Sequence, residues 1–252
     1  MSPPLVTYVL RQADRALVLS QRLSQWLTRA HELEEEMALG NLALDLLGQA
    51  RTLYAYAGEV EGAGRSEDDL AYFRSDREFG NPLLVEQPNG DFALTMVRQL
   101  LHDAWAVPYW EAMTASADPT LSALAAKATK ETAYHLRHCR SWVVRLGDGT
   151  EESHRRTAAA VSRLWRYTGE LFEVDEVEEE LMAAGVAADP AAIRPRWDAI
   201  VDATLAEATL SRPELDDGAQ TTGGRRGMHG EDFSYLIGEL QVVARAHPGA
   251  SW

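Results

Sequence analysis

The sequence predicts an all-α protein, and three observations support this. Apolar residues recur at spacings of three and four along almost all of the 252-residue chain, which is the period of a helix with one buried face. No stretch alternates polar and apolar residues for long enough to indicate a β-sheet. Glycine and proline gather between the periodic segments, where they would end helices and form turns.

The first quarter of the chain predicts two long helices, at about residues 14–30 and 33–60, with a corner between them. Ser66 and Asp69 have the spacing of a helix N-terminus, so a short helix should follow and run to residue 72. The first two helices would form an antiparallel hairpin because so few residues connect them.

A long irregular crossover is predicted at residues 74–90, which contain turn sequences such as Gly80-Asn81-Pro82. The third helix begins near Asp91, and Pro108 should kink or end it. Asp118-Pro119 then opens a fourth helix as its N-cap and first helical residue. Two helical hairpins joined by one long crossover are typical of the ferritin-like four-helix bundle, whereas simple up-down bundles use short loops throughout.

The remainder predicts further helices outside the bundle, at about residues 156–172, 190–210 and 231–246. Residues 212–228 are rich in Gly, Thr and Asp and predict an exposed, extended arm. We therefore expect a single domain over residues 1–252, with the bundle core at about 10–147 and the C-terminal helices and arm at about 150–252.

Composition narrows the class of function. The formal net charge of −15 disfavours binding to nucleic acid or to an anionic membrane, which carry the same sign of charge. The N-terminus resembles no signal peptide and no apolar run is long enough to span a bilayer, so we expect a cytoplasmic protein. The one cysteine, Cys139, lies in an apolar helical pattern and is expected to be reduced and buried.

Ferritin-like proteins that hold two irons use a Glu-x-x-His motif on each of two helices, because residues three apart share one helix face. On the second helix that spacing is occupied by Leu46 and Gln49. On the fourth helix, Thr132 stands three residues before His135. Both motifs are broken, so the sequence predicts no metal site and no cofactor in this chain.

Four ionisable residues nevertheless lie on the predicted inward faces: Asp45, Asp103, Glu131 and His135. Burying them unpaired would cost several kcal/mol each, so we expect a vestigial charge network in which they pair with one another or with an inward Arg or Lys. The alternative is a different helix rotation, which would bring Asp103 and Glu131 to solvent.

Several stretches resemble the C subunit of bacterial ring-epoxidising phenylacetyl-CoA oxygenases. They are residues 44–51, 84–93, 134–137 and 164–166, together with the ending at 248–252; the run Val85-Glu86-Gln87-Pro88-Asn89-Gly90 is the most specific. The resemblance implies a ferritin-like, non-catalytic subunit of a phenylacetyl-CoA epoxidase in phenylacetate catabolism. It also implies a homologous A subunit that holds the di-iron centre, the other epoxidase subunits, and a separate reductase, and it allows a homodimer when the chain is alone.

The family's A subunit has Asp-Glu-Ala-Gly-His on its second helix, after a corner that this chain shares at residues 26–30. Its Glu and His correspond to Leu46 and Gln49, in agreement with the broken metal motif. By resemblance, substrate contacts would fall on Glu78, Phe79, Gly80 and Asn81, where Gly and Asn would expose backbone donors, and on Glu179, Glu180 and Leu181. An ordinary surface loop and a solvated acidic face are the alternatives.

Residues 222–227 form a compact basic, glycine-rich patch in which Arg225 and Arg226 suit a phosphate or a partner's carboxylates. The alternative is a mobile linker. Two other functions stay open: a di-iron oxygenase that uses Asp45, Asp103, Glu131 and His135 as unusual ligands, and a structural helical protein that associates with itself and never contacts CoA.

Overall fold

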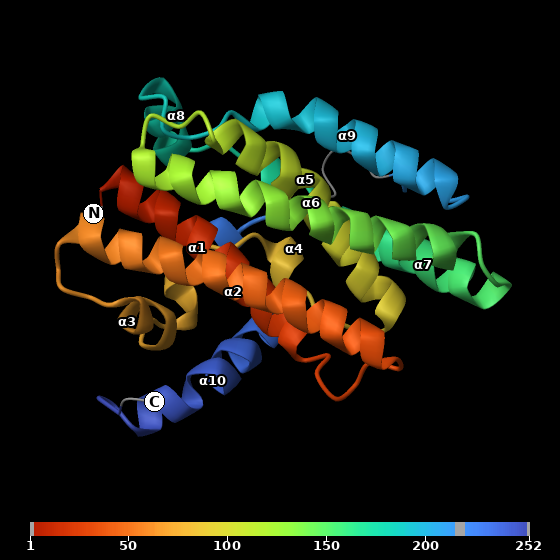
Figure 1. Cartoon of the computed structure of the whole chain (residues 1–252), viewed down its shortest axis with the longest axis horizontal. Coiled ribbons are helices and arrows are strands. Elements are labelled where there is room, and N and C mark those ends of the chain that lie inside the picture. Colours follow the sequence, from red (N-terminus) through yellow and green to blue (C-terminus); the bar gives the residue numbers. More distant parts are fainter. Residues whose placement is uncertain (1–2, 215–219, 251–252) are drawn as a thin grey trace. The chain divides into compact units, whose positions relative to one another are not determined.

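The computed structural model describes residues 3–214 and 220–250, and in them the chain is helical with no β-strand (Figure 1). The all-α prediction is confirmed. The chain forms two compact units, Met1–Pro88 with Gly223–Trp252, and Asn89–Thr222. The prediction of one domain with a bundle core at residues 10–147 stays a prediction.

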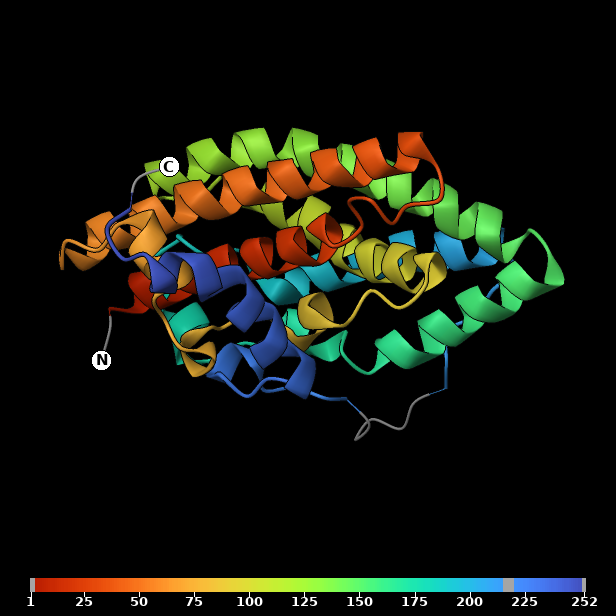
Figure 2. The same cartoon turned by 90° about the horizontal axis from the view of Figure 1, so that it is seen from below.

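The first unit begins with a hairpin of two long helices, which lie side by side in Figures 1 and 2. Short helices of the crossover follow, and the C-terminal helix completes the unit. The elements are α1 (Pro4–Ser24), α2 (Leu33–Glu61), α3 (Glu67–Tyr72), the 3-10 turn η1 (Asp76–Glu78), α4 (Leu83–Glu86), the 3-10 turn η4 (Gly224–Arg226) and α10 (Glu231–Ala246).

The second unit is built around another long hairpin, against which the following helices pack. Its elements are α5 (Phe92–Met113), α6 (Pro119–Gly147), α7 (Glu151–Trp165), η2 (Gly169–Phe172), α8 (Glu176–Ala183) and α9 (Pro190–Glu207). A hairpin, a long crossover and a second hairpin form the chain order of the ferritin-like fold. No described helix is long and apolar enough to cross a membrane.

Three predicted boundaries were wrong. The first helix begins at Pro4 and not near residue 14, because Pro4 stands at its first helical position and Tyr8 and Val9 are buried. Of the two outcomes predicted for Pro108, an end of the helix was wrong, because α5 continues to Met113, and a kink stays a prediction. The helix predicted at 156–172 ends at Trp165 and is followed by η2; α8 was not predicted as a helix of its own.

The helix starts that rest on capping residues are confirmed. Ser66 and Asp69 form a reciprocal capping box at α3, with the Asp69 amide 3.2 Å from the Ser66 hydroxyl. Asp118 accepts hydrogen bonds from the amides of Thr120 and Leu121, each at 2.9 Å, at the start of α6. Local side-chain chemistry therefore defines these ends, which is why the sequence predicted them.

Candidate functional site

The crossover of the first unit is held in place by a buried carboxylate on α1. Asp14 is fully buried and accepts hydrogen bonds from the Tyr54 hydroxyl at 2.6 Å, from the Gly80 amide at 2.8 Å and from the guanidinium of Arg74. Arg74 also donates to the Glu78 carbonyl oxygen at 2.9 Å and lies 4.2 Å from the centroid of the Phe79 ring. One buried ion pair thus fixes the backbone of residues 74–80 against α1 and α2.

The contacts with Asp14 raise the pKa values of both Tyr54 and Arg74. Burial and the neighbouring Asp14 carboxylate raise the pKa of Tyr54, so its hydroxyl stays protonated and donates. Burial alone would lower the pKa of Arg74, but Asp14 outweighs it and the net direction is upward. Arg74 therefore keeps its charge at every pH at which the protein is folded.

The loop predicted to contact substrate lies directly on this support. The Glu78 side chain accepts hydrogen bonds from the amide and hydroxyl of Ser75, both at 2.7 Å, which lowers its pKa. Phe79 and Asn81 are buried, at 1% and 0% exposed. The expectation of an exposed donor at Gly80 was wrong, because its amide binds Asp14; whether residues 78–81 contact substrate stays a prediction.

A second buried carboxylate joins the crossover to the C-terminal segment. Glu86 accepts hydrogen bonds from the Asn81 amide group at 3.0 Å, from His229 Nδ1 at 2.7 Å and from the Gly230 backbone at 2.8 Å. His229 Nε2 lies 3.0 Å from the Phe79 carbonyl oxygen. The Glu86 carbonyl oxygen accepts two hydrogen bonds from Arg22 of α1, at 2.8 and 2.6 Å.

The glycine-rich segment packs tightly against the same loop. A Cβ on Gly224 would collide with the Asn81 carbonyl oxygen, and one on Gly227, where φ is +73°, would collide with the Arg77 carbonyl oxygen. The prediction of an exposed arm was therefore wrong for Gly223 and Gly224, which are buried. Residues 215–219 of that arm lie outside the described residues.

This packing brings two separately predicted sites together. Arg225 and Arg226 form η4, and the Arg225 carbonyl oxygen would lie 3.6 Å from a Cβ built on Gly80. Arg11 of α1 places its side-chain Cγ 3.0 Å from the same point. The crossover loop thus has several arginines on neighbouring segments, although the chain as a whole is strongly acidic.

In the second unit, Asp103 of α5 is fully buried, so the alternative that places it in solvent was wrong. Its Oδ1 lies 2.8 Å from His102 Nδ1 and 3.4 Å from Gln99 Nε2, and its Oδ2 lies 3.7 Å from the Cys139 sulfur of α6. Burial, followed by the Asp103 charge, raises the pKa of Cys139. The predicted burial of this thiol is confirmed. The contacts of Asp103 with His102, Gln99 and Cys139 were not predicted from the sequence.

The other residues of the predicted charge network are placed differently. His135 is fully buried on α6, one turn before Cys139, so both lie on one helix face. Glu131 is only partly exposed and pairs with Lys127, at 3.3 Å, along the same helix. Asp45 is on α2, in the first unit, and is partly exposed. Whether the four act together stays a prediction.

Whether this chain holds a metal ion stays a prediction. Among residues 3–214 and 220–250, no group of three or more His, Cys, Asp or Glu side chains could hold a metal ion. Leu46 and Gln49, which occupy the predicted ligand positions of α2, are buried at 1% exposed each. The donor set does not fit a di-iron centre, which needs several carboxylates and two histidines around one point.

Residues 179–181 lie on α8 of the second unit. Glu179 and Glu180 are exposed, whereas Leu181 is buried at 6% exposed and packs into that unit. This is the arrangement of an ordinary amphipathic helix. Substrate contact there stays a prediction.

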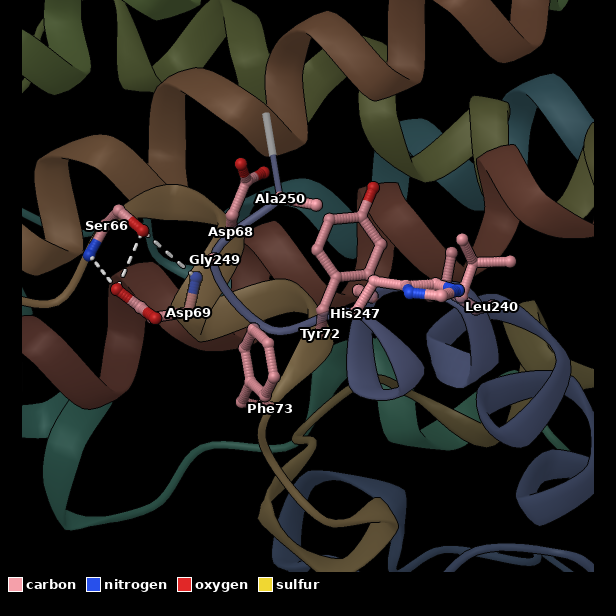
Figure 3. Close-up of a pocket in the computed structure, with 11 residues that line it drawn as sticks. Ser66, Asp68, Asp69, Tyr72, Phe73, Leu240, His247, Gly249 and Ala250 are labelled. Carbon is pink, nitrogen blue, oxygen red and sulfur yellow. Dashed lines mark hydrogen bonds between the residues drawn. The ribbon is translucent and has the colours of Figure 1, made fainter. Parts of the chain in front are cut away.

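A surface cavity of about 460 Å³ lies between α3 and α10 (Figure 3). Ser66 and Asp69 at its edge are hydrogen-bonded to each other, as the dashed lines show. Burial and the nearby Asp68 carboxylate raise the pKa of Tyr72 on its wall. Because Ser66 and Asp69 form the capping box of α3, the polar groups at this edge of the cavity have a structural role.

Comparison with known proteins supplies the context for these sites. The sequence matches the family described as "Phenylacetic acid catabolic protein" over residues 1–252. The chain belongs to this family. It is also similar to the C subunit of the 1,2-phenylacetyl-CoA epoxidase of Escherichia coli (strain K12), with 48% identity over 248 residues, which cover 98% of this chain and 99% of the relative.

Membership of the phenylacetic acid catabolic family confirms the resemblance stated from the sequence. Of the motifs that carried it, Glu86 and Asn89 now have physical roles: Glu86 binds His229, and Asn89 accepts hydrogen bonds from Thr95 and Arg98, at 3.0 and 2.8 Å. Ser251 and Trp252 of the C-terminal motif lie outside the described residues. The sequence reasoning missed Asp14, Arg74 and His229, because their partners are 60 or more residues away in the chain.

Proposed function

We propose that this chain is a non-catalytic subunit of a multicomponent phenylacetyl-CoA epoxidase, which pairs with a separate di-iron subunit and helps to form the CoA-substrate site. The similarity to the C subunit of the Escherichia coli 1,2-phenylacetyl-CoA epoxidase supports a subunit role in phenylacetate catabolism. The proposal that the chain is non-catalytic rests on the residues at the metal-ligand positions of its long helices. Apolar Leu46 and neutral Gln49 replace a carboxylate and an imidazole at the ligand spacing of α2.

The rival in which the chain is itself an oxygenase requires Asp103 and Glu131 to be metal ligands. Asp103 is instead surrounded by hydrogen-bond donors, and Glu131 is paired with Lys127. A buried carboxylate that already accepts three such contacts has few lone pairs left for a metal ion. The iron would therefore belong to the partner subunit, with electrons from the reductase.

The part of this chain that suits the CoA moiety is the crossover loop with its arginines. CoA carries phosphates, and guanidinium groups bind phosphates through paired hydrogen bonds. Arg225 and Arg226 stand on a turn that cannot move away from residues 77–83 without breaking close glycine contacts. Their backbone is therefore positioned before any ligand arrives, which reduces the entropy cost of binding.

Iron content and turnover test the proposal together. The chain would be purified alone and with the di-iron subunit, and iron would be measured by elemental analysis alongside phenylacetyl-CoA turnover in the presence of the reductase. We expect iron and turnover only in the mixture. Iron in stoichiometric amount, or turnover, in the chain alone would contradict the proposal and favour the oxygenase rival.

A second measurement separates a CoA-site role from a purely structural one. In the reconstituted complex, Arg225→Ala with Arg226→Ala should raise KM for phenylacetyl-CoA roughly tenfold or more, since charge-assisted hydrogen bonds contribute about 1.5–3 kcal/mol each. Arg163→Ala, an exposed arginine of α7, is the matched control and should leave KM unchanged. An unchanged KM in the double variant would exclude these arginines from the site.

A further inference from the structure

The turn that carries Arg225 and Arg226 is closed by its own backbone. The Gly223 carbonyl oxygen accepts hydrogen bonds from the amides of Arg226 and Met228, at 2.9 and 3.0 Å. The next residue is His229, whose side chain is bound to the crossover and not to the turn. Only two residues separate His229 from Arg226, and so short a segment has little reach even when it is extended. The position of the imidazole therefore restricts where the two arginines can lie.

His229 is held at both of its ring nitrogens. Nδ1 lies 2.7 Å from the carboxylate of Glu86, and Nε2 lies 3.0 Å from the Phe79 carbonyl oxygen. Glu86 is 2% exposed, and its carboxylate also accepts hydrogen bonds from the Asn81 side chain at 3.0 Å and from the Gly230 amide at 2.8 Å. One imidazole and one carboxylate therefore join the crossover, α4 and the start of α10.

The hydrogen bonds of His229 supply an attraction between the turn and the crossover. A Cβ on Gly224 would collide with the Asn81 carbonyl oxygen, so the two backbones are in close contact there. The same is true of Gly227 and the Arg77 carbonyl oxygen. Those contacts are steric, and they limit how near the turn can approach without holding it in place. His229 follows two residues after Gly227 and is bound to the same loop, so it fixes the approach.

The acidic groups that face His229 come from the elements packed against it. Glu86 of α4 binds the ring directly, and Asp14 of α1 acts on it through space. Asp76 of η1 belongs to the same environment. The hydrogen bond from Ser234 lowers the pKa of Asp76 most, and the charge of His229 contributes to the same shift.

The cations on these elements are engaged with other groups. Arg22 of α1 donates to the Glu86 carbonyl oxygen, at 2.8 and 2.6 Å, and not to its carboxylate. Arg74 is paired with Asp14. The first turn of α10 adds two exposed carboxylates, Glu231 and Asp232. The surroundings of His229 are thus acidic and favour its protonated form.

Protonation decides how many hydrogen bonds the ring can donate. A protonated imidazole donates from both nitrogens, whereas a neutral imidazole has a single N–H. Neutral His229 can therefore donate to Glu86 or to the Phe79 carbonyl oxygen, but not to both. His229 holds the turn by two hydrogen bonds in the protonated state and by one in the neutral state.

We propose that His229 is a positioning residue for the turn of Arg225 and Arg226, and that the turn binds the phosphates of the CoA thioester best while the imidazole carries its second proton. The proposal rests on the CoA-site role proposed for these arginines. His229 acts only through the turn, because both of its ring nitrogens are already bound within the chain.

Turnover by the reconstituted complex at about pH 6, where His229 is protonated, measures the positioning. In His229→Gln we expect KM for phenylacetyl-CoA to rise roughly tenfold, because a charge-assisted hydrogen bond is lost. kcat should not change, since a residue that acts only on substrate binding alters KM alone. His247→Gln, at an exposed histidine at the end of α10, is the matched control and should keep the KM of the parent.

The pH dependence of KM is a readout that a merely structural role would not move. Burial lowers the pKa of His229, but the hydrogen bond and charge of Glu86 outweigh it, and the net direction is upward from 6.5. KM of the parent should stay low below the folded-state pKa and rise as the pH passes through it. In His229→Gln, KM is already raised and should change much less. The CoA phosphates titrate in both proteins, so the difference between the two profiles reports His229.

The outcomes separate the positioning role from the CoA site itself. If Arg225→Ala with Arg226→Ala raises KM and His229→Gln does not, the positioning role is overturned and the CoA-site role stands. If neither variant raises KM, the CoA-site role is wrong and the positioning role falls with it. A KM of the parent that does not rise with pH would also overturn the proposal, and that measurement depends on no variant that has to fold.

Discussion

The imidazole of His229 lies between two hydrogen-bond acceptors, the Glu86 carboxylate at 2.7 Å from Nδ1 and the Phe79 carbonyl oxygen at 3.0 Å from Nε2. A neutral imidazole has one N–H, so an ionised Glu86 and a carbonyl are both satisfied only by the protonated ring. The ring also stacks on Phe233, with centroids 3.9 Å apart. The two acceptors therefore favour the protonated form of His229, which lies between the crossover and the start of α10.

Stability should accordingly depend on pH through this residue. Burial lowers the pKa of His229, but the hydrogen bond and charge of Glu86 outweigh it, and the net direction is upward from 6.5. The stabilisation is then fully present below the unfolded-state pKa and is lost as pH rises through the folded-state pKa. Urea midpoints should therefore fall as the pH rises above about 6.5.

His229→Gln should remove most of that pH dependence, because glutamine keeps a donor but carries no titrating charge. His247→Gln is the control, since His247 is exposed at the end of α10. A midpoint that falls equally in the parent and in His229→Gln would show that another group is responsible.

The buried pair of Asp14 and Arg74 should be among the most sensitive sites in the first unit. Removing either partner leaves an uncompensated buried charge, so Asp14→Ala or Arg74→Ala should each cost about 3–5 kcal/mol. The double variant should cost less than the sum of the two, as a double-mutant cycle in urea would measure. Glu152→Ala breaks exposed pairs with Arg155 and Arg156 and should change the midpoint by much less.

The close contact between the glycine-rich turn and the crossover predicts that a larger residue in the turn will destabilise the first unit. Gly224→Ala must displace the Asn81 carbonyl, and overpacking of this kind costs about 1–3 kcal/mol. Hydrogen exchange should then accelerate in residues 223–246. The control is Gly238→Ala in α10, where a Cβ would meet no atom within 4 Å. It should stabilise the helix by up to about 1 kcal/mol. Faster hydrogen exchange in both variants would show that the contact with Asn81 is not the cause.

Cys139 should be chemically inert in the native protein. Its thiol is buried and its pKa is raised, so the reactive thiolate is scarce at neutral pH. We expect negligible labelling by a thiol reagent in buffer and complete labelling in denaturant. A chain with a second cysteine at exposed Glu180 is the positive control and should take up one label at once; rapid native labelling of the parent would contradict the buried geometry.

The sequence predicted most helices because their signals are local: the three–four periodicity, the capping box at Ser66 and the Asp118-Pro119 start. It placed the beginning of α1 at about residue 14, whereas the helix begins at Pro4. Asp14 is in fact buried in mid-helix, and the Arg74 that stabilises it is 60 residues away. The glycine-rich arm was misread for a similar reason, since nothing within residues 223–227 shows that they pack on residues 77–83.

The same distinction applies to the candidate site. The loss of the Glu-x-x-His motif at Leu46 and Gln49 could be predicted because the two positions are only three residues apart in the sequence. The hydrogen bond that Asp103 accepts from Cys139 depends on how α5 and α6 face each other, whereas its other partner, His102, is its neighbour in sequence on α5.

The division of the chain has a consequence for its synthesis. The chain leaves the first unit at Pro88 and returns to it only at Gly223. The second unit is therefore an insertion in the first, and its synthesis is finished before that of the first unit. Chains fold largely in the order in which they emerge, and until His229 is translated Glu86 and the crossover lack their last partner. The earliest residues made are therefore among the last to reach their final state, and a chain interrupted at residue 222 would leave its own beginning unfinished.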